Sequence, residues 1–201
     1  MAKVAAVSKL AETLDVFVSR FGESHRLVLV GGLAVSARTM PRFTRDVDFT
    51  VAVADDNEAE SLVLATQALG YVIEAALEQI GSGRLTTVRL RRANDPIVDL
   101  LFSACGIESE IALAANMLFV LGRPVPVATV GHLVAMKLLS RDPKKRPRDE
   151  EDLLALARVA DSVEWERAAE SVALIEARGF GRKRDLRTAL ADLRALDLTD
   201  D

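Results

Sequence analysis

The sequence predicts an α+β fold, in which a mixed sheet with flanking helices is followed by a helical C-terminal part. Short apolar runs that are typical of strands occur between residues 26 and 128, whereas apolar residues recur at helical spacing from Thr129 onward. No internal repeat, low-complexity stretch or linker rich in Gly, Ser or Pro divides the 201 residues. Strands early and helices late are typical of an α+β core that carries a helical appendage. We therefore expect a core over residues 1–128 and a helical region over residues 129–201 that packs on it.

The first elements are expected to be a helix, a strand and a second, short helix. Residues 4–21 place apolar side chains at near-helical spacing, which predicts an amphipathic helix. The apolar run Arg26–Val30 contains β-branched residues and predicts a buried strand. This strand ends at Gly31 and Gly32, after which residues 33–40 predict a short helix.

A helix, two strands and a β-segment are expected to complete the core. Residues 55–70 predict a helix, because an aspartate stands at the start of this segment and a glycine at its end. Two strands are expected over residues 84–92 and 96–103, separated by the turn signal Asn-Asp-Pro. A helix near residues 109–115 and a short β-segment over residues 117–129 follow. In the last part of the chain, helical spacing predicts helices over residues 130–139, 149–160, 163–177 and 182–196.

The composition is that of a globular protein. Half of the residues are hydrophobic and 28% are charged. No apolar run approaches the roughly 20 residues that span a bilayer, and the N-terminus lacks the apolar segment of a secretory signal. The one cysteine, Cys105, rules out an internal disulfide and fits a reducing compartment. We therefore expect a cytoplasmic protein that has no membrane segment.

The charge of the chain is unevenly distributed. A net charge of −4 argues against general coating of nucleic acid. The segment Arg141–Arg148, however, reads RDPKKRPR and holds five bases and a single acid. A local basic patch can bind phosphate even when the whole protein is acidic.

Two glycines and two aspartates form the motif that carries chemistry. A strand that runs into Gly31 and Gly32 and then into a helix exposes backbone N–H groups to an anion, and the missing side chains allow a triphosphate to approach closely. On the strand predicted over residues 46–54, Asp46 and Asp48 fall on one face, with Cα atoms roughly 6–7 Å apart. Two carboxylates at this spacing repel each other unless a cation lies between them, and oxygen ligands without His or Cys favour Mg²⁺ or Mn²⁺.

Asp99 is a third candidate carboxylate. It lies in the apolar run 96–103, where an ionised side chain needs a cation or strong hydrogen-bond donors. One metal ion held by Asp46 and Asp48, and a second that also contacts Asp99, would form the two-ion arrangement of in-line phosphoryl transfer. Each motif alone is also compatible with a plain turn or a solvated strand face, but their joint occurrence in this order favours the catalytic interpretation.

These motifs resemble those of the nucleotidyltransferase superfamily that includes DNA polymerase β. The stretch GGLAVSARTMPRFTRDVDF is similar to the abortive-infection nucleotidyltransferase toxins of the AbiEii and MenT-like group. In that group a lysine on a helix precedes a basic stretch and a K-D-x-x-D-L motif. Here VGHLVAMKLLSRDPKKRPRDEEDL supplies the matching residues, with arginine in place of the motif lysine: Lys137, Arg148, Asp149 and Asp152. The resemblance covers about residues 26–155 and implies that residues 1–128 form a polymerase-β-type nucleotidyltransferase core.

The resemblance implies transfer of a nucleoside monophosphate from an NTP to an acceptor hydroxyl, with the 3′ end of tRNA as acceptor and a cognate antitoxin as partner. It implies Asp46, Asp48 and Asp99 as metal ligands and catalytic residues, together with Lys137. The nucleotide is expected to contact residues from the first motif and from the lysine helix and the motif that follows it. These residues are Gly31, Gly32, Thr44, Arg45, Lys137, Arg148, Asp149 and Asp152. Three alternatives remain open: an aminoglycoside-type small-molecule nucleotidyltransferase, a nucleotidyltransferase that modifies protein hydroxyls, and a non-catalytic nucleotide-binding module such as an antitoxin.

Overall fold

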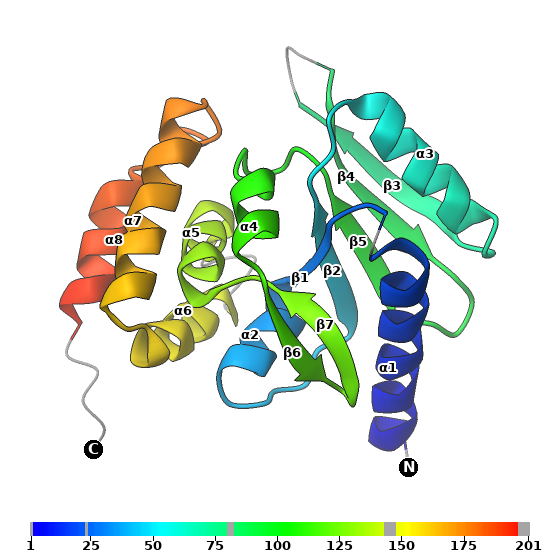
Figure 1. Ribbon diagram of the computed structural model, residues 1–201. Coiled ribbons are helices and arrows are strands. Elements are labelled where there is room, and N and C mark those ends of the chain that lie inside the picture. The colour runs from blue at the N-terminus through cyan, green and yellow to red at the C-terminus, as the bar shows by residue number, and fades with distance from the viewer. Residues whose placement is uncertain (1, 23, 80–82, 143–147, 197–201) are drawn as a thin grey trace.

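The computed structural model describes residues 2–22, 24–79, 83–142 and 148–196 (Figure 1). The helices are α1 (Ala2–Phe21), α2 (Gly31–Arg38), α3 (Asp56–Gln67), α4 (Glu108–Ala114), α5 (Val130–Ser140), α6 (Arg148–Val159), α7 (Ser162–Ala177) and α8 (Leu186–Ala195). The strands are β1 (Leu27–Val30), β2 (Asp46–Val51), β3 (Val72–Glu78), β4 (Leu85–Arg91), β5 (Ile97–Leu101), β6 (Asn116–Val120) and β7 (Arg123–Val127).

The strands form one mixed seven-stranded sheet. Their order is β3-β4-β5-β2-β1-β7-β6, so β2 lies at the centre between β1 and β5. Strand β2 is antiparallel to β1 and parallel to β5, and its Asp48 is in register with Val30 on one side and Asp99 on the other. The register therefore brings the end of β1, where Gly31 follows, next to the two strands that carry the acidic residues.

The sheet and the helices share one hydrophobic core. On one side of the sheet Phe17 of α1 stacks on Phe49 of β2, with ring centroids 5.6 Å apart. Figure 1 shows α1 and α3 at one end of the molecule and α5–α8 at the other. Helix α5 packs closely on α7, and Gly131 permits this approach because it has no Cβ atom. A Cβ atom there would come within 2.4 Å of the Glu164 carbonyl oxygen. The buried residues of α5–α8 and those of the sheet form a single cluster.

The α+β fold is confirmed, with shifts at the ends of elements and one strand that the sequence did not reveal. Strand β3 was not predicted, because all seven of its residues are exposed and its sequence, VIEAALE, is rich in helix formers. Helix α2 begins at Gly31 itself rather than at residue 33. Helix α8 begins at Leu186 rather than at residue 182, because Arg182 and Lys183 have positive φ and the side chain of Asp185 caps the helix. Among the described residues no helix is long and apolar enough to cross a membrane.

Candidate active site

The turn between β1 and α2 requires its glycines. Gly31 has a φ of +66°, and a Cβ atom there would come within 2.0 Å of Oδ2 of Asp48. A Cβ atom on Gly32 would come within 2.9 Å of an Nη atom of Arg42. Val30 at the N-cap supplies no side-chain hydrogen bond to the first turn of α2. The start of helix α2, where backbone N–H groups have no partner within the helix, therefore lies beside the Asp48 carboxylate. Neither glycine places a side chain between the helix and this carboxylate.

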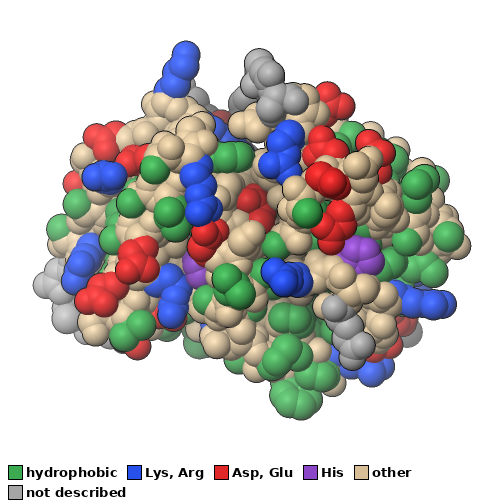
Figure 2. All heavy atoms as spheres, turned by 45° about the horizontal axis from the view of Figure 1, so that its top comes forward, with side chains coloured by type: hydrophobic (Ala, Val, Ile, Leu, Met, Phe, Trp, Pro, Cys, Tyr) green, Lys and Arg blue, Asp and Glu red, His purple; other side chains and the backbone are tan. Residues whose placement is uncertain are grey.

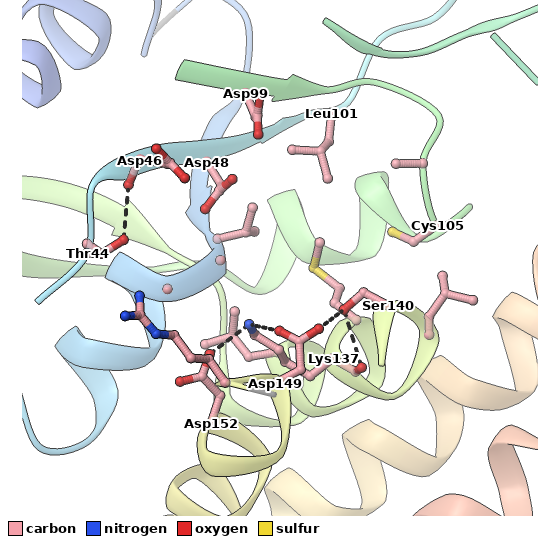
Figure 3. Close-up of a pocket in the computed structure, with 18 of the residues that line it drawn as sticks. Thr44, Asp46, Asp48, Asp99, Leu101, Cys105, Lys137, Ser140, Asp149 and Asp152 are labelled. Carbon is pink, nitrogen blue, oxygen red and sulfur yellow. Dashed lines mark hydrogen bonds and ion pairs between the residues drawn. The ribbon is translucent and has the colours of Figure 1, made fainter. Parts of the chain in front are cut away.

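Three carboxylates line the strand side of the site. Asp46 and Asp48 point from the same face of β2, and Asp99 lies beside Asp48 on the parallel neighbour β5 (Figure 3). Thr44 donates a hydrogen bond from Oγ1 to the backbone carbonyl of Asp46 at 3.4 Å, which connects the segment before β2 to the first residue of this strand. Burial raises the pKa of Asp46, and the negative charge of Asp99 adds to this shift, while Arg89 and Arg45 oppose it. The protein therefore concentrates negative charge at this point of the sheet.

Arg89 on β4 is the cation that stands beside this acidic group. It donates hydrogen bonds from Nε to Oδ1 of Asp99 at 2.8 Å and from Nη2 to Oδ2 at 2.7 Å. Hydrogen bonding to Asp99 and the charges of the three aspartates raise the pKa of Arg89 above its ordinary value, although burial opposes the shift. Arg89 therefore partly neutralises the cluster through its side chain.

A buried ion network lies on the opposite side of the site (Figure 3). Nζ of Lys137 on α5 lies 2.7 Å from Oδ1 of Asp149 and 2.7 Å from Oδ2 of Asp152, both on α6. Arg42, in the connection before β2, donates to both carboxylate oxygens of Asp152 at 2.7 Å. Ser140 donates to Asp149 at 3.2 Å. Since the Asp152 side chain is only 1% exposed, its two cationic partners compensate the cost of burying its charge.

The three strand carboxylates and the ion network around Lys137 face each other across a cavity of about 550 Å³. Figure 2 shows acidic side chains inside the hollow at the centre of one face, with Lys or Arg side chains on both sides of it. Nearly all of the predicted site residues line this cavity, from both halves of the chain: Gly31, Gly32, Thr44, Asp46, Asp48, Asp99, Lys137, Arg148, Asp149 and Asp152. The exception is Arg45, which is exposed and is not among the lining residues. Residues 143–147 of the predicted basic patch lie outside the described residues.

Three arginines of the cavity were not among the predicted site residues. Arg42, Arg89 and Arg182 all line it. The partner of Asp99 could have been found from the turn signal, because Arg89 and Asp99 stand at equal distances from Asn94 and antiparallel strands pair in this way. No comparable signal in the sequence points to Arg182, which comes from the connection between α7 and α8.

A divalent cation fits Asp46 and Asp48. Within the described parts of the chain no group of three or more His, Cys, Asp or Glu side chains is gathered closely enough to hold a metal ion by itself. Mg²⁺, however, is commonly held by one or two carboxylates together with water and substrate phosphates. The missing Cβ of Gly31 lets the Asp48 carboxylate lie directly against the glycine turn, since a Cβ atom there would come within 2.0 Å of Oδ2 of Asp48. The donor set is therefore that of a metal ion which arrives with a phosphorylated substrate.

Comparisons with known proteins identify the family and the fold. The family model for the nucleotidyl transferase AbiEii toxin of type IV toxin–antitoxin systems matches residues 13–200. No curated protein sequence matches the chain. An antigenic nucleotidyltransferase-like protein from Paracoccidioides brasiliensis is 17% identical, with a TM-score of 0.52 over 92% of this chain and 93% of that one, and shares the fold.

Two further structures are more distant. The lincosamide antibiotic adenylyltransferase LnuA, bound to lincomycin, is 15% identical, with a TM-score of 0.47 over 76% of this chain and 97% of that one. The nucleotidyltransferase toxin MenT4 from Mycobacterium tuberculosis is 18% identical, with a TM-score of 0.39 over 95% of this chain and 94% of that one.

Proposed function

The chain belongs to the AbiEii nucleotidyl transferase toxin family, and we propose that this nucleotidyltransferase moves an NMP from an NTP to the 3′-terminal hydroxyl of tRNA, with release of pyrophosphate. The family is one of type IV toxin–antitoxin systems, which implies a cognate antitoxin. We further propose that the protein acts in the cytoplasm, where a chain with a single buried cysteine needs no oxidising environment.

The observation that carries the proposal is the register around Asp48. Asp48 lies opposite Val30, next to the glycine turn, and beside Asp99 on the other strand. A phosphate held by the N–H groups of Gly31 and Gly32 would therefore lie within reach of the carboxylate pair. The proposed ligands of Mg²⁺ are Asp46 and Asp48, and this ion would offset the negative charge of the triphosphate when bound.

The remaining side chains of the cavity have separate proposed roles. Asp99 faces the acceptor and orients its hydroxyl, since a carboxylate that accepts two hydrogen bonds from Arg89 still has lone pairs for a third donor. Lys137 has three N–H donors, of which Asp149 and Asp152 accept two, and its third is assigned to a phosphate oxygen. Catalysis by this arrangement would depend mainly on positioning and on charge compensation.

We prefer an anionic acceptor to a cationic drug because of Arg148 and Arg182. Among the described residues, five aspartates and five Lys or Arg side chains line the cavity, and Arg89 is paired with Asp99. Arg148 and Arg182 would attract a phosphate and repel an aminoglycoside. A non-catalytic module is disfavoured by the presence of carboxylates at all three strand positions.

The test is a transfer assay with each NTP labelled at its α-phosphate. The purified chain is incubated with Mg²⁺ and, separately, with total tRNA, a protein extract or an aminoglycoside mixture. We expect label in the tRNA fraction and its release when the terminal nucleotide is removed. Label only in an aminoglycoside, or no transfer from any NTP, would contradict the proposal.

A further inference from the structure

The connection between α7 and α8 reaches over the loop that follows β5. Arg178 donates to the carbonyl of Gly106, and Arg182 donates from Nη2 to the carbonyl of Ala104 at 3.0 Å. The ring of Phe180 lies against Gly106, where a Cβ atom would come within 2.4 Å of it. The C-terminal helical region is thereby attached to the segment that begins only a few residues after Asp99.

Arg182 comes from this connection into the wall of the cavity. It lines the cavity together with Ala104 and Cys105, on the side of β5 rather than that of the glycine turn. Arg182 and Lys183 have φ angles of +52° and +59°, a conformation that residues with a side chain seldom adopt. Two such residues in succession reverse the chain at this point and bring a guanidinium to the acceptor side of the site.

The same turn continues as a basic edge outside the cavity. Arg182, Lys183 and Arg184 follow one another and all are exposed. Arg184 donates from Nη1 to the backbone carbonyl of Arg141, which connects this edge to the segment that follows α5. Arg148, at the start of α6, also lines the cavity. Cationic side chains from two segments far apart in the sequence therefore meet at the mouth of the site.

We propose that Arg182, Lys183 and Arg184 bind successive backbone phosphates of a nucleic-acid acceptor, with Arg182 holding the phosphate nearest to the reacting hydroxyl. A strand whose end lies in the cavity beside Asp99 and that passes Arg182 would continue over Lys183 and Arg184, the next residues of the same turn. The phosphates of the NTP belong on the other side, at Gly31, so these bases serve the acceptor and not the nucleotide. The inference rests on the proposed function and adds the surface that recognises the acceptor.

The experiment measures RNA binding and nucleotide binding separately. Fluorescence anisotropy with end-labelled tRNA, without NTP, is recorded over a range of salt concentrations for the wild type and for Arg182→Gln, Lys183→Gln and Arg182→Lys. Arg187→Gln is the matched control, since Arg187 lies on α8, pairs with Glu176 at 2.7 Å and is 70% exposed. Calorimetry with NTP and a thermal melt are run on the same preparations.

We expect Arg182→Gln and Lys183→Gln to bind tRNA about tenfold more weakly at low salt, each with a slope of log affinity against log salt that is smaller by about 0.7. Arg182→Lys should retain the slope, and Arg187→Gln should match the wild type. NTP affinity should not change in any variant. If Arg182→Gln does not fold, Lys183→Gln decides the question by the same readout.

Two outcomes separate this inference from the proposed function. If the wild type labels tRNA but the two glutamine variants bind tRNA with an unchanged slope, the acceptor surface is elsewhere and the proposed function stands. If the wild type neither binds nor labels tRNA and labels protein instead, the proposed function and the inference both fail.

Discussion

Arg89 and Asp99 are joined by two parallel hydrogen bonds across neighbouring antiparallel strands, at 2.8 Å and 2.7 Å. The Asp99 side chain is 12% exposed, whereas that of Arg89 is 44% exposed and faces the cavity. Arg89 also interacts with the charges of Asp46 and Asp48. In the protein without a divalent cation, Arg89 therefore supplies positive charge to the strand side of the site, where Asp46, Asp48 and Asp99 lie.

Replacement of Arg89 by Gln should destabilise the metal-free protein by about 1–2 kcal/mol, because the buried Asp99 loses its partner and the half-exposed guanidinium is screened by solvent. Added Mg²⁺ should raise the melting temperature of this variant by more than it raises that of the wild type. Arg91→Gln is the control, since Arg91 lies on the same strand and pairs with Glu74 away from the cavity. Equal melting temperatures of the two variants in EDTA would remove Arg89 from this role.

Gly31→Ala should lose both stability and transfer. The added Cβ would come within 2.0 Å of Oδ2 of Asp48, in a backbone conformation with φ +66°. Gly122 is a matched control, because it has φ +82° and an added Cβ there meets nothing within 4 Å. Gly122→Ala should cost about 1–2 kcal/mol from backbone strain alone, with transfer retained. Chemical denaturation of both variants measures the difference, and equal losses would show that the contact with Asp48 is not limiting.

His132 makes the stability of the helical region depend on pH. Burial, with a contribution from the charge of Arg167, lowers the pKa of His132 to about 4. The unfolded chain takes up a proton near pH 6.5 and the folded chain only near pH 4, so the free energy of unfolding should fall as the pH falls through this window. The loss attributable to His132 is about 3 kcal/mol.

The measurement is the free energy of unfolding between pH 7 and pH 4 for the wild type and two variants. His132→Gln removes the titrating group and should flatten the decrease. His25→Gln changes the other histidine, which is half-buried and lies before β1, and should leave the decrease as it is in the wild type. An unchanged slope in His132→Gln would assign the acid sensitivity to other groups.

The sequence was sufficient to place the parts of the site that depend on local pattern. The alternation of β2 puts Asp46 and Asp48 on one face, and the glycine turn follows directly from Gly31 and Gly32. Both features need only the geometry of one strand and one turn. The sequence could not show which residues Lys137 pairs with, because its ion pairs with Asp149 and Asp152 depend on how α5 packs against α6.

Other features depend on contacts that no local pattern specifies. The edge strand β3 forms because β4 offers it a partner, although its Ala, Leu and Glu residues favour a helix in isolation. The position of Arg182 depends on two residues with positive φ and on a hydrogen bond to a loop 78 residues away in the chain. These features follow from the tertiary fold and become visible only in the structure.

Asp99→Asn should separate nucleotide binding from the transfer step. Asn keeps the shape and one acceptor oxygen for Arg89 but loses the charge that orients and activates the acceptor hydroxyl. NTP affinity measured by calorimetry with Mg²⁺ should survive, while the single-turnover rate should fall by about 10²–10⁴-fold. A loss of NTP affinity as large as that of Asp48→Asn would contradict this division between the two strands. Full activity would make Asp99 a structural acid.

The central claim is that Asp46 and Asp48 carry the transfer reaction, and label transfer by Asp46→Asn and Asp48→Asn tests it most directly. Burial and the charge of Asp99 raise the pKa of Asp46, so removal of its charge should also raise the melting temperature of the metal-free protein at pH 7. We predict folded variants that are at least as stable as the wild type in EDTA and that transfer no label from any NTP. Folded variants that both retain transfer at the wild-type rate would contradict the account.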